Sequence, residues 1–215
     1  MSNQATSSSE LNTSTTRAGR MSPAARKEQL LSCAIKVFAN KGIGEAVHAD
    51  VAAHAGVSTP TTFHYFRTRN DLVFAVLDEI HRFLIEEIVV THYSPDLNGA
   101  ESIEDILMTF CDAIQTKPEY IQVWLEWSVS IKREIWPQYL KFYRAAIKGV
   151  KVVLRRGIED GSVKPQIDLD DCARVIVGLA HTVAQMKYSK CSRKTIQHTI
   201  HSLVSGYLAD PSMAS

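Results

Sequence analysis

The stretch HADVAAHAGVSTPTTFHYF, residues 48–66, predicts two very short helices joined by a glycine turn. In the first helix, Val51, Ala52 and Ala55 recur at helical spacing, so one small apolar stripe faces inward. Gly56 follows where a helix must end with a residue at positive φ, and glycine adopts that conformation without steric cost. These residues therefore predict a helix, a tight turn and a second helix.

The second short helix begins after Ser58, a good N-cap, and Pro60 lies in its first turn, where a missing N–H breaks no helical bond. Phe63 and Phe66 are three residues apart, so we expect both to anchor this helix to a core. A helix this short, with hydroxyl groups and an aromatic ring on its free face, suits the major groove of DNA. The alternative is a helical hairpin with an ordinary solvated face. The side chains expected on the free face are Thr59, Thr61, Thr62, His64 and Tyr65.

Longer helices flank this pair. Ser22 and Pro23 predict a helix start, and Lys41-Gly42 predicts its end. Downstream, Thr68 with Asp71 three residues later forms a capping-box pattern. Three such helices make a small unit whose third helix reads DNA, and a fourth joins it to the rest of the chain. The apolar positions are Leu30, Leu31, Ala34, Ile35, Val37 and Phe38 in the first helix, and Leu72, Val76, Ile80, Leu84 and Ile88 in the fourth.

Residues 23–90 resemble the DNA-binding domain of the TetR family of bacterial transcriptional regulators. This resemblance rests on Ala34, Phe38 and Gly42, on DVAAHAGVS at residues 50–58, and on FHYF at residues 63–66 with a following DL pair. Residues 17–208 further resemble the HapR/LuxR-type quorum-sensing master regulators. The motifs that carry this narrower resemblance are KGIG at residues 41–44, HAD at 48–50, VWLEWS at 123–128 and EIWP at 134–137.

The resemblance implies a set of DNA contacts. In the subgroup, an arginine-bearing arm ahead of the first helix enters the minor groove; Arg20 matches it and Arg17 is offset, although a plain solvated tail is the alternative. Tyr65 and Arg69 match positions that commonly hold phosphates. His64 stands where the subgroup usually has asparagine, so the preferred operator is expected to differ. Independently, the helix that begins at His48 would point its N-terminus at a phosphate. The candidate DNA-binding residues are Arg17, Arg20, His48, Ser58, Thr59, Thr61, Thr62, His64, Tyr65 and Arg69.

Charge distribution agrees with DNA binding at one end. The chain has 215 residues and a formal net charge of +1, and 45% of its residues are hydrophobic, enough for one DNA-binding module and one larger helical domain. The first 70 residues hold eight basic and four acidic side chains, a net charge of +4, and the remainder carries −3. A basic head on a mildly acidic body fits phosphate contact through the head.

The rest of the chain predicts helices with loops near residues 94–99, 117–118, 160–168 and 189–192, and no strand pattern of useful length, so we expect an all-α fold. In the TetR family the second domain holds a pocket between helices that tunes the protein's affinity for DNA, and the resemblance implies that a small hydrophobic ligand could bind there. The alternative is that these side chains form a plain core. Tyr143 replaces a smaller polar residue expected from the resemblance, which would reshape the cavity. By the match to the subgroup, the pocket lining is Leu84, Ile88, Cys111, Trp124, Tyr139, Tyr143, Ile147 and Leu179.

The last two helices are expected to form a homodimer interface, a four-helix bundle with a second copy. His198 and His201 would be a metal pair only with a third ligand, which the spacing does not supply, so we expect no metal site. The apolar stripes of the last two helices are Leu169, Ala173, Val177, Ala180 and Ala184, then Ile196, Ile200, Leu203 and Val204. Four residues are small enough to let helices approach closely: Gly178, Ala180, Ala184 and Gly206.

Other classes are less well supported. The four cysteines are far apart, which favours reduced buried thiols over a disulfide framework or a redox sensor. Adjacent carboxylates on a helix diverge, and no phosphate loop or nucleophile elbow is present, so we expect neither catalysis nor a cofactor. No apolar run approaches membrane-spanning length, and we expect a cytoplasmic protein.

The sequence thus predicts four segments: a flexible arm at residues 1–20, a helix-turn-helix domain at 21–68, a regulatory and dimerisation domain at 69–208, and a tail at 209–215. The function predicted is that of a sequence-specific transcriptional regulator of quorum-sensing type, which binds double-stranded DNA as a homodimer. The alternative is a local repressor of an efflux or metabolic operon that a small ligand releases.

Overall fold

The computed structural model describes residues 21–92, 96–131 and 133–208. Within these ranges the secondary structure is helical and contains no strand, which confirms the predicted all-α fold. The expected arm at residues 1–20, with Arg17 and Arg20, and the expected tail at residues 209–215 lie outside the described residues.

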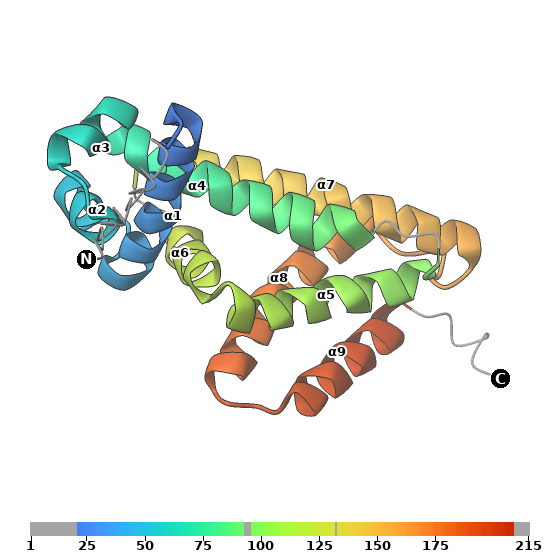
Figure 1. Cartoon of the computed structure of the whole chain (residues 1–215). Helices are drawn as coiled ribbons and strands as arrows, with labels where there is room; N and C mark the ends of the chain where they lie inside the picture. Colours follow the sequence, from blue (N-terminus) through green and yellow to red (C-terminus); the bar gives the residue numbers. More distant parts are fainter. Residues whose placement is uncertain (1–20, 93–95, 132, 209–215) are drawn as a thin grey trace, which may run out of the picture.

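Three helices at one end form the unit that the sequence predicts to bind DNA, called here the DNA-binding unit: α1 (Pro23–Lys41), α2 (His48–Ala55) and α3 (Thr59–Tyr65) (Figure 1). Their predicted ends are confirmed. Ser22 caps α1 by accepting the Ala25 N–H at 3.2 Å, and Gly42 ends the helix with φ 89°. Gly56 ends α2 in the left-handed region, with φ 65°. The local signals in the sequence were therefore sufficient to place these helices.

The fourth helix, α4 (Arg69–Arg82), begins with the predicted capping box, in which Thr68 and Asp71 exchange two hydrogen bonds. The predicted apolar stripe is buried along its whole length. The helix does not continue regularly. It widens into a π-helical segment, η1 (Phe83–Val89), and ends in a short 3₁₀ turn, η2 (Val90–His92). Hydrophobic periodicity carried no signal for this change of pitch, because a π-turn shifts the register by only one residue.

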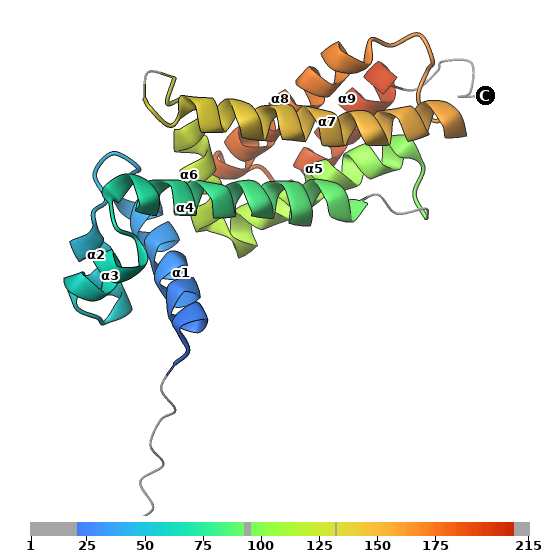
Figure 2. The same cartoon turned by 90° about the horizontal axis from the view of Figure 1, so that it is seen from above.

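Five helices make the body: α5 (Gly99–Thr116), α6 (Pro118–Ser128), α7 (Trp136–Asp160), α8 (Leu169–Tyr188) and α9 (Arg193–Leu208). Among them α5 is central, because it packs against α6, α7, α8 and α9. The long helix α7 runs beside α4 (Figures 1 and 2), and Gln138 donates to Asp78 between them at 2.6 Å. The start of α5 approaches α7 so closely that a Cβ on Gly99 would lie 2.2 Å from the Gly157 Cα.

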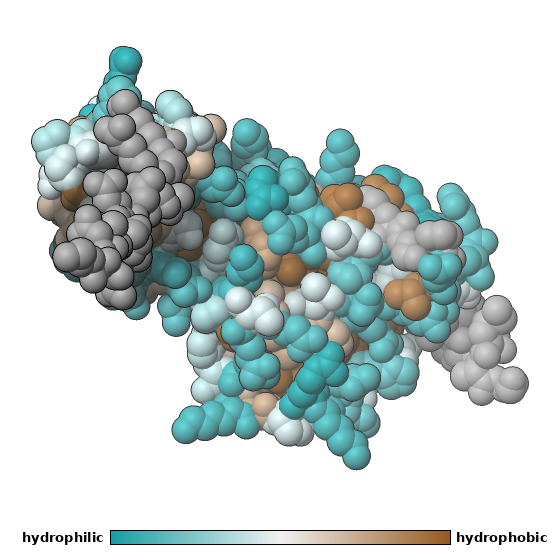
Figure 3. Space-filling view, viewed as in Figure 1, coloured by the Kyte–Doolittle hydropathy of each residue, from teal (hydrophilic) through white to brown (hydrophobic). Residues whose placement is uncertain are grey.

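A continuous apolar core joins the two parts of the molecule, from Leu30 in α1 to Leu208 at the end of α9. Viewed from the side of Figure 1, the surface of the body is mostly hydrophilic, with apolar side chains showing in patches between its helices (Figure 3). No helix within the described residues is long and apolar enough to cross a membrane.

Candidate nucleic-acid interface and regulatory cavity

The recognition helix α3 packs through a different face from the one predicted. Phe66 is buried as expected, but Phe63 is 46% exposed and Thr62 is fully buried. The reason is the helical period: Thr62 and Phe66 are four residues apart and share one face, whereas Phe63 lies about 100° around the helix from Thr62. Thr62 is therefore removed from the candidate base-reading residues, and Phe63 joins the exposed face.

His48 fastens α3 to α2. Its side chain is buried, its Nε2 lies 2.7 Å from the Phe66 carbonyl oxygen, and its ring stacks on Phe63 with centroids 4.0 Å apart. Because a carbonyl oxygen only accepts, Nε2 carries the proton that is donated. The imidazole is thus a structural group inside the unit, and an approach of DNA to this site would involve the N-terminus of α2.

The exposed face of α3 is hydroxylic and aromatic. Ser58 and Thr61 bond to each other through their hydroxyl oxygens at 2.8 Å. His64 is exposed and its ring meets the edge of the half-buried Tyr65, with centroids 5.1 Å apart. With the half-buried Thr59, these side chains offer donors and acceptors of the kind that contact base edges and phosphates.

Arg69 holds the α1–α2 loop, residues 42–47. Its guanidinium donates to three carbonyl oxygens of that loop: Ala46 at 3.1 Å, Ile43 at 2.5 Å and Gly44 at 2.8 Å. The sequence placed Arg69 at a phosphate, and this geometry engages most of its donors inside the protein. The planar fork of arginine suits several carbonyls at once, which a lysine ammonium does not.

The body holds the same loop from the other side. Both carboxylate oxygens of Glu126, on α6, accept from the Ile43 N–H, at 3.0 and 2.9 Å. A Cβ on Gly42 would lie 3.3 Å from this carboxylate, so the glycine leaves it room. These residues are 83 positions apart in the sequence, and the sequence marked Glu126 only as part of the VWLEWS motif, without indicating its partner.

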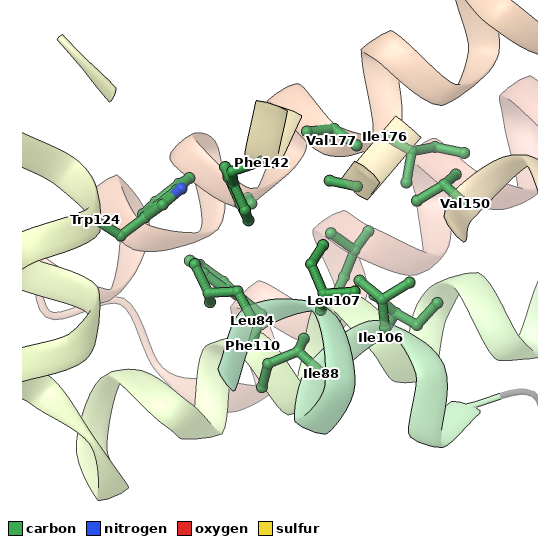
Figure 4. Close-up of a pocket in the computed structure, with 14 residues that line it drawn as sticks. Leu84, Ile88, Ile106, Leu107, Phe110, Trp124, Phe142, Val150, Ile176 and Val177 are labelled. Carbon is green, nitrogen blue, oxygen red and sulfur yellow. The ribbon is translucent and has the colours of Figure 1, made fainter. Parts of the chain in front are cut away.

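A cavity of about 60 Å³ lies inside the body, bounded by the π-helical segment, α5, α6, α7 and α8 (Figure 4). Three predicted pocket residues, Leu84, Ile88 and Trp124, line it, as does Phe142. A buried site for one water needs roughly 10–15 Å³ on this scale, and the cavity exceeds that minimum several-fold. Its remaining lining is apolar: Ile85, Val89, Ile106, Leu107, Phe110, Ala146, Val150, Ile176, Val177 and Ala180.

The other five predicted pocket residues do not line this cavity. Cys111 is buried in the core, where burial raises the pKa of its thiol. Tyr139 and Tyr143 stack on each other, with centroids 6.3 Å apart, and burial raises the pKa of Tyr139 to about 12. Ile147 lines an exposed groove among basic side chains of α7, and Leu179 lies on the outer side of α8. Residues one to three positions away on the same helices line the cavity instead.

The outer side of α8 and α9 carries an exposed apolar face. Val175, Leu203 and Tyr207 are 47%, 44% and 41% exposed, and they border a groove of about 150 Å³. A Cβ on Gly178 or Gly206 would meet no heavy atom within 4 Å, so both glycines lie open. Most of the predicted interface stripe faces the chain's own core instead: Ala173, Ala184, Ile196, Ile200 and Val204 are buried.

A helix-turn-helix unit joined by a shared core to a helical body with an internal apolar cavity defines a DNA-binding transcriptional regulator. The sequence-family model that describes the bacterial regulatory proteins of the tetR family matches residues 30–76. The chain is 33% identical to the HTH-type transcriptional regulator LuxR of Vibrio harveyi over 193 residues, which cover 88% of this chain and 90% of the relative. The chain therefore belongs to the TetR family, whose members are regulators of transcription and not enzymes, and the resemblance found in the sequence is confirmed.

Other proteins are similar at lower sequence identity, and two solved structures share the fold. The repressor KstR2 of Mycolicibacterium smegmatis is 27% identical, over 72% of this chain and 75% of its own length. The structure of the regulator FadR from Bacillus subtilis in complex with stearoyl-CoA has a TM-score of 0.70 at 18% identity, over 82% of this chain and 96% of that one. The structure of the ketosteroid regulator KstR2 of Mycobacterium tuberculosis has a TM-score of 0.64 at 19% identity, over 86% and 95%.

Proposed function

We propose that this protein is a quorum-sensing-type master regulator that binds pseudo-palindromic operators as a homodimer. The observation that carries the proposal is the similarity to LuxR of Vibrio harveyi along 88% of the chain, because a match of this length extends beyond the DNA-binding unit into most of the body. In this proposal Ser58, Thr59, Thr61, His64 and Tyr65 contact bases or phosphates in the major groove. Arg17 and Arg20 reach the minor groove from the segment before α1.

The exposed face of α8 and α9 supports the homodimer. It presents Val175, Leu203 and Tyr207 beside two open glycines, and such a face lets helices of a second copy approach closely. In such a dimer the two recognition helices would sit about one DNA turn apart, ~34 Å, on the two half-sites. We further propose the division given above, with DNA binding in residues 21–68 and regulation and dimerisation in residues 69–208.

The dimer is tested by a charge placed in that face. Leu203→Glu should give a monomer in sedimentation at micromolar concentration and weaken operator binding about 100-fold, because the two half-sites lose their linkage. Val152→Glu is the matched control, since Val152 is 42% exposed on α7, away from this face. A native protein that stays monomeric both free and on DNA would contradict the proposal.

A local repressor released by a ligand is the second candidate, and the internal cavity favours it. The same cavity also fits a master regulator whose affinity is tuned by a ligand. α6 connects the cavity to the DNA-binding unit, because Trp124 lines the cavity and Glu126, two residues later, holds the α1–α2 loop. A ligand that displaced Trp124 would thus move a helix that is bonded to the DNA-binding unit.

A genome-wide map of binding sites separates the two functions. A master regulator should occupy many unlinked promoters, each with a pseudo-palindromic site. Occupancy of a single operon adjacent to its own gene would contradict the quorum-sensing role and establish the local repressor. Either result leaves the family assignment unchanged.

A further inference from the structure

One polar atom faces the apolar cavity without a partner. Trp124 is 2% exposed, and its indole Nε1 is buried with no hydrogen-bond acceptor among the described residues. Figure 4 shows this nitrogen on the edge of the ring that faces Phe142 and the interior of the cavity. Buried N–H donors are nearly always bonded, so an acceptor brought into the cavity would satisfy this one.

A second tryptophan on the same helix provides the comparison. Trp127 is also fully buried, and its Nε1 donates to the Ile135 carbonyl oxygen at 3.2 Å. Trp127 does not line the cavity. The unbonded indole is therefore the one that borders the open space, and the bonded indole is the one enclosed by protein.

The surroundings of Trp124 favour a neutral acceptor. The residues that line the cavity are all apolar, so none would neutralise a bound charge. His181 rests on the Trp124 ring, with centroids 4.3 Å apart, and burial lowers the pKa of its imidazole below the usual 6.5. Its Nε2 is bonded to the Ser128 hydroxyl at 3.0 Å, and that hydroxyl donates to the Leu125 carbonyl at 2.7 Å. A carboxylate here would meet no cation and would lose its hydration.

We propose that the cavity binds a neutral, mainly apolar molecule whose single carbonyl oxygen, of a ketone or an ester, accepts a hydrogen bond from Trp124 Nε1–H. The inference deepens the effector role of the cavity and rests on it. The volume of about 60 Å³ is smaller than the roughly 150 Å³ of a cavity that admits benzene, so a six-carbon molecule enters only when the lining side chains move. Trp124 fixes the orientation of the molecule, and the apolar walls supply most of the affinity.

The test compares three probes of similar length on the full-length protein: 2-hexanone, hexane and hexanoate. Calorimetry should detect 2-hexanone binding and no hexanoate binding. In Trp124→Phe, the affinity for 2-hexanone should fall about tenfold while that for hexane stays the same or rises. Trp127→Phe is the matched control and should leave both affinities unchanged. Thermal unfolding of each variant verifies its fold.

A measurement on the unmutated protein avoids the question of folding. In ¹H–¹⁵N spectra, the indole N–H signal of Trp124 should move downfield with 2-hexanone and not with hexane. The signal is assigned by its loss in Trp124→Phe. A signal that responds equally to both probes would overturn the hydrogen bond.

Failure of the effector role and failure of the carbonyl preference are distinguishable. Ala146→Leu fills the cavity, so unchanged binding in this variant would place the probes elsewhere and would overturn both. Absence of all binding to the native protein at millimolar probe concentration would have the same consequence. Binding that Ala146→Leu abolishes, with Trp124→Phe weakening hexane and 2-hexanone equally, would retain the cavity as a ligand site and overturn the donor role of Trp124.

Discussion

The α1–α2 loop and the cavity both contact α6, through Glu126 and Trp124, but each is stabilised by a different kind of interaction. Backbone groups of the loop are bonded by the Arg69 guanidinium from one side and by the Glu126 carboxylate from the other. The cavity is enclosed by aliphatic and aromatic side chains, and its one buried polar atom, Trp124 Nε1, is unbonded. Directional bonds specify one arrangement, whereas apolar contact tolerates adjustment. The DNA-binding unit is therefore fixed in orientation while the cavity wall can adapt.

This difference has a consequence for single substitutions. A small three-helix unit buries little apolar surface, so a few polar bonds make up a large share of what positions it. The body has a large core that absorbs a single change. We expect the greatest effects on DNA binding from polar residues at the loop.

The largest effect is expected for Arg69→Ala. Loss of three bonds to loop carbonyls should lower the free energy of unfolding by about 2 kcal/mol, the usual contribution of hydrogen bonds to a charged group. DNA binding should weaken at least tenfold, because the loop no longer positions the DNA-binding unit. Urea unfolding and fluorescence anisotropy measure the two quantities. Arg67→Ala, at an exposed arginine two residues earlier, removes the same charge as a control. Unchanged stability with a salt slope reduced by about one would instead identify Arg69 as a phosphate contact.

A smaller effect is expected for Glu126→Gln. The amide oxygen still accepts from the Ile43 N–H, but the charge and the second acceptor are lost, so DNA affinity should fall about threefold to tenfold. Glu119→Gln removes an equal charge from the start of the same helix and should have little effect. If Glu126 links the cavity to the DNA-binding unit, the variant should also lose most of any change in DNA affinity that a cavity ligand produces. Equal behaviour of the two variants would reduce Glu126 to a long-range charge.

His64 and Arg20 should differ in the kind of effect they have. His64→Ala should weaken the best operator by about 1–3 kcal/mol and leave scrambled DNA nearly unchanged, because an exposed side chain of the recognition helix contacts bases. Arg20→Ala should weaken both duplexes and lower the salt slope by about one. Titrations at several salt concentrations measure both. A uniform loss for His64→Ala would make it a backbone contact and leave base selection to Thr59 and Thr61.

The smallest effect concerns pH. Burial holds the pKa of His181 below 6.5, so between that lowered value and 6.5 the unfolded chain binds a proton that the folded chain does not. Stability should therefore fall as pH drops through 6.5 towards the folded pKa and level off below it. His81, whose pKa burial also lowers, contributes in the same direction. Unfolding measured from about pH 7.5 to about pH 5.5 should show a shallower dependence in His181→Gln than in the native protein, and an equal dependence in the two proteins would contradict this prediction.

The sequence by itself determined the features that depend on neighbours within a few residues. The N-cap at Ser22, the glycine ends at Gly42 and Gly56, and the capping box at Thr68 each act within one turn of helix, so local chemistry settles them. Hydrophobic period then identified the buried stripe of α4. Family motifs located the DNA-binding unit because they preserve these same local requirements.

Only the tertiary structure decided which side chains are available to a partner. Thr62 and Phe63 are adjacent, yet Thr62 is buried, whereas Phe63 is partly exposed and stacks on the imidazole of His48 across the turn. The bonds of Glu126 and Arg69 to the α1–α2 loop, the cavity beside the π-helical segment, and the outer face of α8 and α9 all join residues far apart in the chain. Such contacts depend on how whole helices pack in three dimensions. Hydrophobic periodicity predicts that one face of a helix is buried, but it does not identify the helix or loop against which that face packs.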